Sequence, residues 1–239
     1  MRYTEEVTQR MSSISASLKN HESTVDAKLL EAYSIPPVLY DIRGFLILTF
    51  AYQSTLWSQI AFFGKNIGKR HLDVAVGTCT LLYLTLKWRK FRKKTEGEVI
   101  AIDYVPSMLA GGRKFFRNNP HVTLEVGDAM HLTFADNSFD TVNIANSVHC
   151  ISDVDAAFRE TFRVLKPQGR FAANVLLYPQ GIFPFKQIAG AINRWGIKKG
   201  ILATPYERED VRARLVASGF TILDESVSGN CYNVLAAKP

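Results

Sequence analysis

Two acidic residues stand near the ends of neighbouring apolar runs, and each precedes a turn. The stretch "HLDVAVGTCT", residues 71–80, contains Asp73 and then three small positions spaced by two, Ala75, Gly77 and Cys79. In "VIAIDYVPSM", Asp103 stands at the end of the next apolar run. Small residues let backbone N–H groups approach a ligand closely, and a carboxylate accepts hydrogen bonds from hydroxyl groups. The pattern is typical of a loop that binds a ribose-bearing ligand.

The spacing of the small residues narrows the class of ligand. A dinucleotide loop has the form G-x-G-x-x-G, in which the third glycine admits a pyrophosphate to a helix N-terminus. Here the small positions recur every second residue and Thr80 follows, which argues against a dinucleotide. A purely structural turn remains an alternative for the loop, as does a helix cap for Asp103.

The elements that must position these residues alternate along the chain from His71 onward. Alternation of strand-like runs with helical segments favours an α/β fold: a Rossmann-like open sheet, mostly parallel, with helices on both faces. The runs with strand character are "HLDVAV", "EVIAIDYV", "VTLEVGD", "FDTVNIAN" and "RFAANVLLY".

The end of the chain departs from the alternation. "FTILDESV" and "NCYNVLAAK" are separated only by a short turn around Gly229, so we expect an antiparallel C-terminal hairpin strand. An insertion at about residues 178–205, containing Phe183, Phe185 and Trp195, lies where a substrate lid would sit. The predicted main domain therefore spans residues 71–239.

Residues 1–70 are expected to form a helical N-terminal cap. Val7, Met11, Ile14 and Leu18 lie on one helical face. Residues 44–64, "GFLILTFAYQSTLWSQIAFFG", carry no charge and approach the length of a membrane span, but polar residues interrupt their centre. We interpret them as a helix that packs on an apolar groove; a membrane span or an interfacial anchor is the alternative.

A longer string identifies a family. "FDTVNIANSVHCISDVDAAFRETFRVLKPQGRFAANV" resembles the "F-D... L-H-H... R-V-L-K-P-G-G-R" region of class I S-adenosylmethionine-dependent methyltransferases, in particular the small-molecule group similar to ubiquinone/menaquinone C-methyltransferases. The resemblance covers roughly residues 71–176. It implies S-adenosylmethionine as the cofactor, with Asp103 on the ribose hydroxyls and Asp128 on the adenine amino group. The cofactor-binding residues predicted in this way are Asp73, Ala75, Gly77, Cys79, Asp103, Tyr104, Met108, Asp128, Ala129 and Asn146.

Three positions depart from the family pattern. Cys79 stands in place of a glycine and can narrow the loop, and Gln168 replaces another glycine. After the fourth strand the chain reads "NSVHCISD", where quinone enzymes carry glycine-leucine-arginine-asparagine.

His149 in this segment is a candidate catalytic base; a packing role beside the cofactor is the alternative. Tyr40, Tyr52 and Trp57 are candidates for lining an acceptor pocket, with plain core as the alternative.

Composition limits the remaining partners. The 239-residue chain has a net charge of +7, concentrated in a basic run at residues 87–94 that is interpreted as a solvated helix end. Contact of this run with acidic lipid or RNA is the alternative. Three cysteines far apart in sequence and a polar N-terminus favour a cytoplasmic protein. No metal site is expected.

The predicted function is methyl transfer to a small apolar or aromatic acceptor, with nucleic acid not expected as a partner and peripheral membrane contact left open. Two other functions are weighed against it. One is a catalytically impaired fold that binds a ligand or a partner, and the other is an RNA methyltransferase.

Overall fold

The computed structural model describes residues 37–95, 97–199 and 202–239. They form a sheet of seven strands in the spatial order β3-β2-β1-β4-β5-β7-β6. The strands are β1 (Arg70–Val74), β2 (Glu98–Asp103), β3 (Val122–Val126), β4 (Phe139–Ile144), β5 (Leu165–Leu176), β6 (Thr221–Ser228) and β7 (Cys231–Ala237).

The direction of the strands confirms the predicted fold class. The pairings from β3 through β5 are parallel, whereas β7 is antiparallel to both β5 and β6. The last strand of the chain therefore lies inside the sheet, between β5 and β6, and not at its edge. Strands β1, β2 and β4 are buried on both faces along almost their whole length, as expected for central parallel strands.

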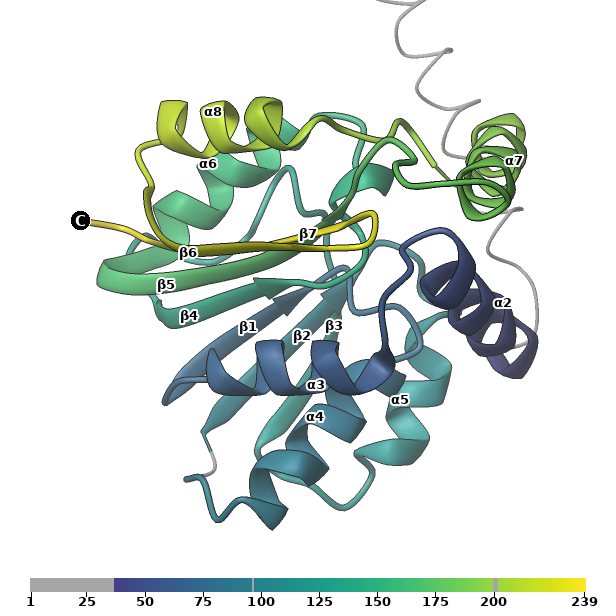
Figure 1. Cartoon of the computed structure of the whole chain (residues 1–239). Coiled ribbons are helices and arrows are strands. Elements are labelled where there is room, and N and C mark those ends of the chain that lie inside the picture. Colours follow the sequence, from purple (N-terminus) through teal and green to yellow (C-terminus); the bar gives the residue numbers. More distant parts are fainter. Residues whose placement is uncertain (1–36, 96, 200–201) are drawn as a thin grey trace, which may run out of the picture.

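Helices cover both faces of the sheet (Figure 1). On one face lie α3 (Leu56–Lys65), α4 (Thr80–Phe91) and α5 (Leu109–Phe115), and on the other lie α6 (Val154–Val164) and α8 (Arg208–Ala217). Leu82 and Leu109 form a core cluster with Val99 on the first face. Phe158 and Val211 belong to the larger cluster on the second face.

The apolar stretch at residues 44–64 is two helices, so the prediction of one continuous helix is wrong. Helix α2 (Pro37–Phe50) ends before a strap, residues 51–55, and α3 begins after it. Within the strap, Gln53 takes a left-handed φ of 53°, and the Thr55 side chain caps α3 by accepting from the Ser58 N–H. The left-handed backbone of Gln53 ends the helical path, and Thr55 starts a new helix by satisfying the free N–H of Ser58.

In the part of the chain that the structure describes, no helix is both long and apolar enough to cross a membrane. The helical face predicted at Val7, Met11, Ile14 and Leu18 lies outside the described residues.

The insertion after β5 contains one helix, α7 (Phe185–Lys198). Helix α7 packs beside α2 at the carboxyl edge of the sheet, which is the edge where β1 and β2 end (Figure 1). The division into a cap at residues 1–70, a main domain at 71–239 and a lid at about 178–205 stays a prediction.

Candidate functional site

The loop after β1 keeps the backbone shape that glycines would give it. Ala75, Gly77 and Cys79 all adopt left-handed φ values of 54°, 58° and 63°. Only glycine takes this conformation without steric cost, which explains why a glycine suits each of the three positions. The loop thus retains three left-handed turns even though two of its residues carry side chains.

The side chain of Cys79 packs in the core between α4 and α5. It is fully buried, and its Sγ is 2.3 Å from where a Cβ on Gly112 of α5 would stand. Burial raises the pKa of the thiol to about 12, so the group is neutral at physiological pH. The Cys79 side chain therefore fits because Gly112 of α5 has no side chain and leaves space for the sulfur.

The carboxylate of Asp103 joins the ends of β1 and β2. Its Oδ2 accepts a hydrogen bond of 2.7 Å from the Gly77 N–H, and its Oδ1 accepts one of 2.9 Å from the Val105 N–H. Burial raises the pKa of Asp103, and these two hydrogen bonds oppose the rise. Each carboxylate oxygen retains a lone pair for one more donor, such as a ribose hydroxyl.

Asp73, in β1, has fewer hydrogen-bond partners for its carboxylate than Asp103 has. Its Oδ1 is buried and has no hydrogen-bond partner among the described residues, and burial raises the pKa of the carboxyl to about 7. A cationic group beside it would satisfy that oxygen and favour the charged form. The α-ammonium of S-adenosylmethionine is such a group, so the acids and the open loop fit this cofactor.

Helix α2 covers the loop and contributes an acid that the sequence patterns do not reveal. The Thr78 hydroxyl donates to Asp41 Oδ1 at 2.6 Å, and the Thr80 hydroxyl donates to Asp41 Oδ2 at 2.8 Å. A Cβ on Gly77 would lie 3.8 Å from the ring of Tyr40. Asp41 is missed in sequence analysis because nothing in a helical pattern indicates which loop an acid will face.

Other predicted cofactor residues follow β2 and β3. Tyr104 is exposed and Met108 is buried at the start of α5. Asp128 Oδ1 accepts from the Met130 N–H at 2.8 Å, and its Oδ2 is 3.2 Å from His131 Nδ1. Their roles, and that of Ala129, stay predictions.

Asn146 has partners within the protein. Its side-chain amide exchanges hydrogen bonds of 2.8 and 2.9 Å with that of Gln59 in α3, and its Oδ1 also accepts from Asn174 Nδ2. The network fastens α3 to the ends of β4 and β5. This geometry favours a positioning role over direct contact with a cofactor.

His149 lies in a short 3-10 turn, η1 (Val148–Cys150), after β4 and meets a residue of the strap. The hydroxyl of Tyr52 is 2.9 Å from His149 Nε2 and 3.0 Å from Nδ1, although the residues are 97 positions apart. Both side chains are buried. Burial lowers the pKa of His149 to about 3 and raises that of Tyr52, so the pair is uncharged. A neutral imidazole can accept a proton.

The strap that carries Tyr52 is anchored by the turn between β6 and β7. The Asn230 N–H donates to the Tyr52 carbonyl at 2.8 Å, and Asn230 Nδ2 donates to the Ala51 carbonyl at 2.7 Å. A Cβ on Gly229 would be 2.5 Å from the Cβ of Gln53. Only glycine permits the turn to approach the strap this closely.

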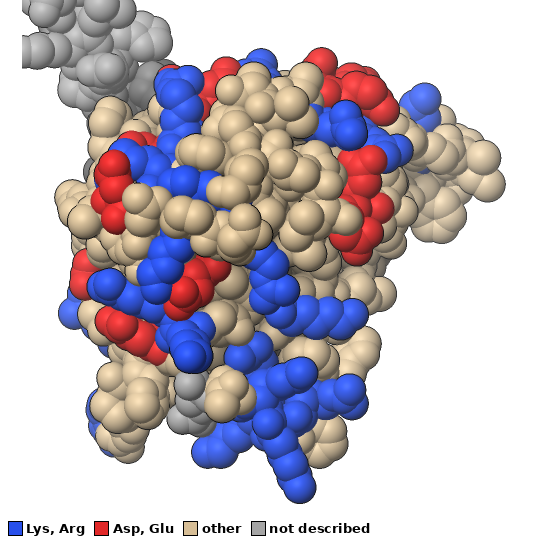
Figure 2. All heavy atoms as spheres, turned by 90° about the vertical axis from the view of Figure 1, so that its left-hand side faces the viewer, with Lys and Arg blue, Asp and Glu red and all other residues tan. Residues whose placement is uncertain are grey.

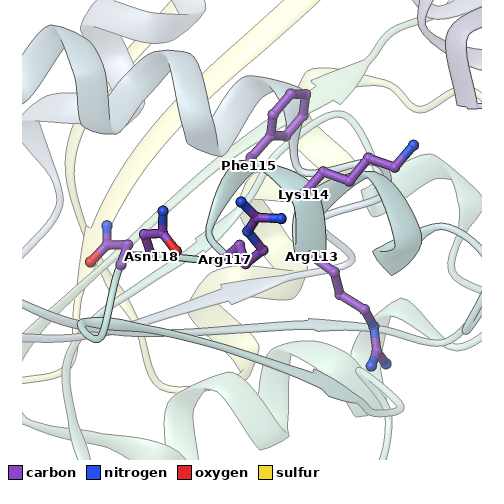
Figure 3. Close-up of a pocket in the computed structure, with 6 residues that line it drawn as sticks. Arg113, Lys114, Phe115, Arg117 and Asn118 are labelled. Carbon is purple, nitrogen blue, oxygen red and sulfur yellow. The ribbon is translucent and has the colours of Figure 1, made fainter.

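The basic run lies at the opposite edge of the sheet. Helix α4 starts at the loop and carries its last residues to the amino ends of the strands; Figure 2 views that face and shows Lys and Arg gathered low on it. A hollow of about 430 Å³ nearby is lined by Arg113, Lys114 and Arg117. These three side chains diverge in Figure 3, so they do not converge on one ligand.

Comparison with known proteins agrees with this geometry. The model of the family described as "Methyltransferase domain" matches residues 72–173, which include the loop, Asp103 and His149. A structure of an S-adenosylmethionine-dependent methyltransferase from Aquifex aeolicus superposes with a TM-score of 0.61 at 18% identity, covering 86% of this chain and 100% of that one. At this identity the likeness shows the fold.

Two curated relatives share more sequence. A demethylmenaquinone methyltransferase of Symbiobacterium thermophilum is 36% identical over 107 residues, covering 44% of this chain and 41% of the relative. A ubiquinone/menaquinone biosynthesis C-methyltransferase of Dinoroseobacter shibae is 32% identical over 134 residues, covering 55% and 52%. The chain thus matches about half the length of these relatives.

Proposed function

Since the chain contains a class I S-adenosylmethionine-dependent methyltransferase domain, similar to that of the ubiquinone/menaquinone C-methyltransferase group, we propose that it methylates a small aromatic acceptor of quinone type. The match of residues 72–173 to the methyltransferase domain model supports the predicted family and its cofactor for this part of the chain. The acceptor and the activity of the whole chain are the parts proposed here.

One observation carries the proposal: the carboxylate of Asp103 is fixed by the backbone of the loop at Gly77. A ribose held there by its two hydroxyls would lie beside the left-handed turns of the loop. Asp73 would pair with the ammonium group of the cofactor, because its free oxygen is otherwise a buried group without a partner. Bound S-adenosylmethionine supplies an electrophilic methyl group on its sulfonium.

On the acceptor side, His149 is the proposed base. Because burial lowers the pKa of His149 to about 3, the imidazole is too weak a base for a resting phenol. The acceptor becomes strongly acidic as the methyl group bonds to it, and the neutral imidazole can take the proton released in that step. Tyr52 is the proposed positioning residue, since its hydroxyl contacts the ring nitrogens and fixes the ring plane. The cap formed by α2 and the strap would exclude water and align the acceptor with the methyl group.

The acceptor class rests on the names of the relatives and on the apolar cap. Leu48, Ala51 and Tyr52 pack in one cluster with Leu176 and Cys231 of the sheet, which surrounds the Tyr52–His149 pair with apolar groups. An RNA acceptor is disfavoured because the basic run at residues 87–94 lies at the opposite edge of the sheet from the loop. "NSVHCISD" in place of the segment found in quinone enzymes favours an acceptor that differs in detail from theirs.

The proposal is tested with the full chain and methyl-labelled S-adenosylmethionine. We expect label transfer to a short-chain demethylmenaquinol, and no transfer to total RNA. Calorimetry with S-adenosylhomocysteine separates two failures. Binding without transfer to the quinol rejects the acceptor class, whereas no binding rejects the methyltransferase activity and leaves only the fold.

A further inference from the structure

Many of the large apolar side chains in and beside helices α2 and α7 are exposed to solvent. In α2 the outward side chains of Leu39, Ile42, Phe45, Leu46 and Phe50 are exposed, and only Leu48 among its apolar residues with described side chains is fully buried. Ile182 and Phe183, just before α7, are 79% and 77% exposed, and Trp57 in α3 is 66% exposed. Exposed apolar side chains in this number mark a surface that contacts a membrane or another protein.

The same surface carries cations and no acids. Lys186, Arg194, Lys198 and Lys199 are exposed on α7 and its end. The sequence contains no Asp or Glu at residues 42–72 or 178–206, which together supply α3, α7 and most of α2. Aromatic and aliphatic residues mixed with lysine and arginine are typical of helices that lie in a membrane interface.

The single acid of α2 is turned away from this surface. Asp41 accepts hydrogen bonds from the hydroxyls of Thr78 and Thr80, so its charge faces the loop after β1. The outer side of α2 is therefore free of negative charge. An anionic surface would meet only apolar groups and cations there.

From these observations we propose that α2 and α7 form a docking face for an anionic lipid bilayer. A second copy of the chain fits less well, because a symmetric pair formed by this face would bring together two surfaces that carry cations and no acids to pair with them. The two helices lie at the carboxyl edge of the sheet (Figure 1). Helix α2 contacts the loop through Asp41 and leads directly into the strap that carries Tyr52. Docking there would bring α2 and the strap to the bilayer, where an apolar acceptor is dissolved. Bilayer binding itself does not depend on methyl transfer.

Co-sedimentation of the full chain with vesicles tests the proposal without cofactor or acceptor. We expect binding to phosphatidylcholine vesicles that contain phosphatidylglycerol, and much weaker binding to phosphatidylcholine alone. The double change Lys198→Ser with Lys199→Ser should lower the partition coefficient about fivefold per lysine. The double change Ile182→Ser with Phe183→Ser should lower it by about tenfold or more.

The end of α4 offers matched controls, because it pairs an 83% exposed Phe91 with exposed Lys93 and Lys94. Phe91→Ser, and Lys93→Ser with Lys94→Ser, should leave binding unchanged. If these controls abolish binding while the α7 variants retain it, the docking face is misplaced. No binding by the wild-type chain, or a dimer in light scattering that the Ile182→Ser/Phe183→Ser variant converts to monomer, overturns the bilayer as occupant. Thermal melting checks that every variant is folded.

Discussion

The site divides into a cofactor half, at the ends of β1 and β2, and an acceptor half, at the end of β4, and the two are held in different ways. In the cofactor half, Asp103 binds backbone N–H groups within 26 residues of itself. In the acceptor half, His149 meets Tyr52 across 97 residues of sequence, and both side chains are uncharged. In the proposed function, the first half would bind a charged cofactor through carboxylates and backbone N–H groups, and the second would accept one proton in apolar surroundings.

The difference teaches that the two halves should fail separately. Substitution of the acids in the cofactor half should weaken binding of the cofactor. Substitution of Tyr52 or His149 in the acceptor half should lower turnover and leave cofactor binding unchanged.

The largest effect is expected for Asp103→Ala. The change removes the proposed ribose ligand and leaves the Gly77 and Val105 N–H groups without their acceptor, so the Kd for S-adenosylhomocysteine should rise by about 100-fold or more. Isothermal calorimetry measures it. Asp140→Ala is the matched control, since Asp140 binds Lys166 and the Arg70 N–H at the amino edge of the sheet. An unchanged Kd for Asp103→Ala rejects the ribose role.

An intermediate effect is expected for Tyr52→Phe, which keeps the ring and deletes only the hydroxyl that contacts His149. Losing one buried hydrogen bond should lower kcat about tenfold, while the Kd for S-adenosylhomocysteine stays the same. Tyr83→Phe serves as control, because Tyr83 stacks on Phe115, away from His149. Equal loss of cofactor binding and turnover would show that Tyr52 is structural only.

A separate effect, on stability and not on binding or turnover, is expected for Asp73→Asn and depends on pH. The pKa of Asp73 is raised to about 7 by burial, so the folded chain binds more protons than the unfolded chain as pH rises from 4 to 7. Wild-type stability therefore falls with rising pH, and the amide variant removes this loss. Between pH 5 and pH 8 the variant should gain roughly 2 kcal/mol on the wild type, measured by chemical unfolding.

Two controls sharpen the Asp73 experiment. Asp140→Asn should open no such gap: burial raises the pKa of Asp140, but hydrogen bonds from Lys166 and the Arg70 N–H bring it below its usual value. S-adenosylhomocysteine should narrow the gap for Asp73, because its ammonium pairs with the carboxylate. A pH-independent difference would contradict the assignment.

How much could be predicted from the sequence follows the same division. The sequence predicts the succession of strands along the chain, the position of Asp103 at the end of β2, and the family. Each of these depends on the spacing of residues close together in the sequence. The Tyr52–His149 contact is not, because no local pattern indicates which cap residue reaches which strand end. The break at residues 51–55 was missed because a helical spacing of apolar residues continues across the polar strap. Cys79 could not be judged without Gly112, which lies 33 positions away in sequence.

The turn at Gly229 and Asn230 gives the protein a particular order of assembly. Chains emerge from the ribosome N-terminus first, so the strap at residues 51–55 is made well before the turn that anchors it. A nascent chain that ends before β6 already contains every residue of both halves, yet its strap has no turn to dock against. Completion of the site is thus tied to synthesis of the turn between β6 and β7, and a chain truncated before Gly229 should leave the cap unfastened.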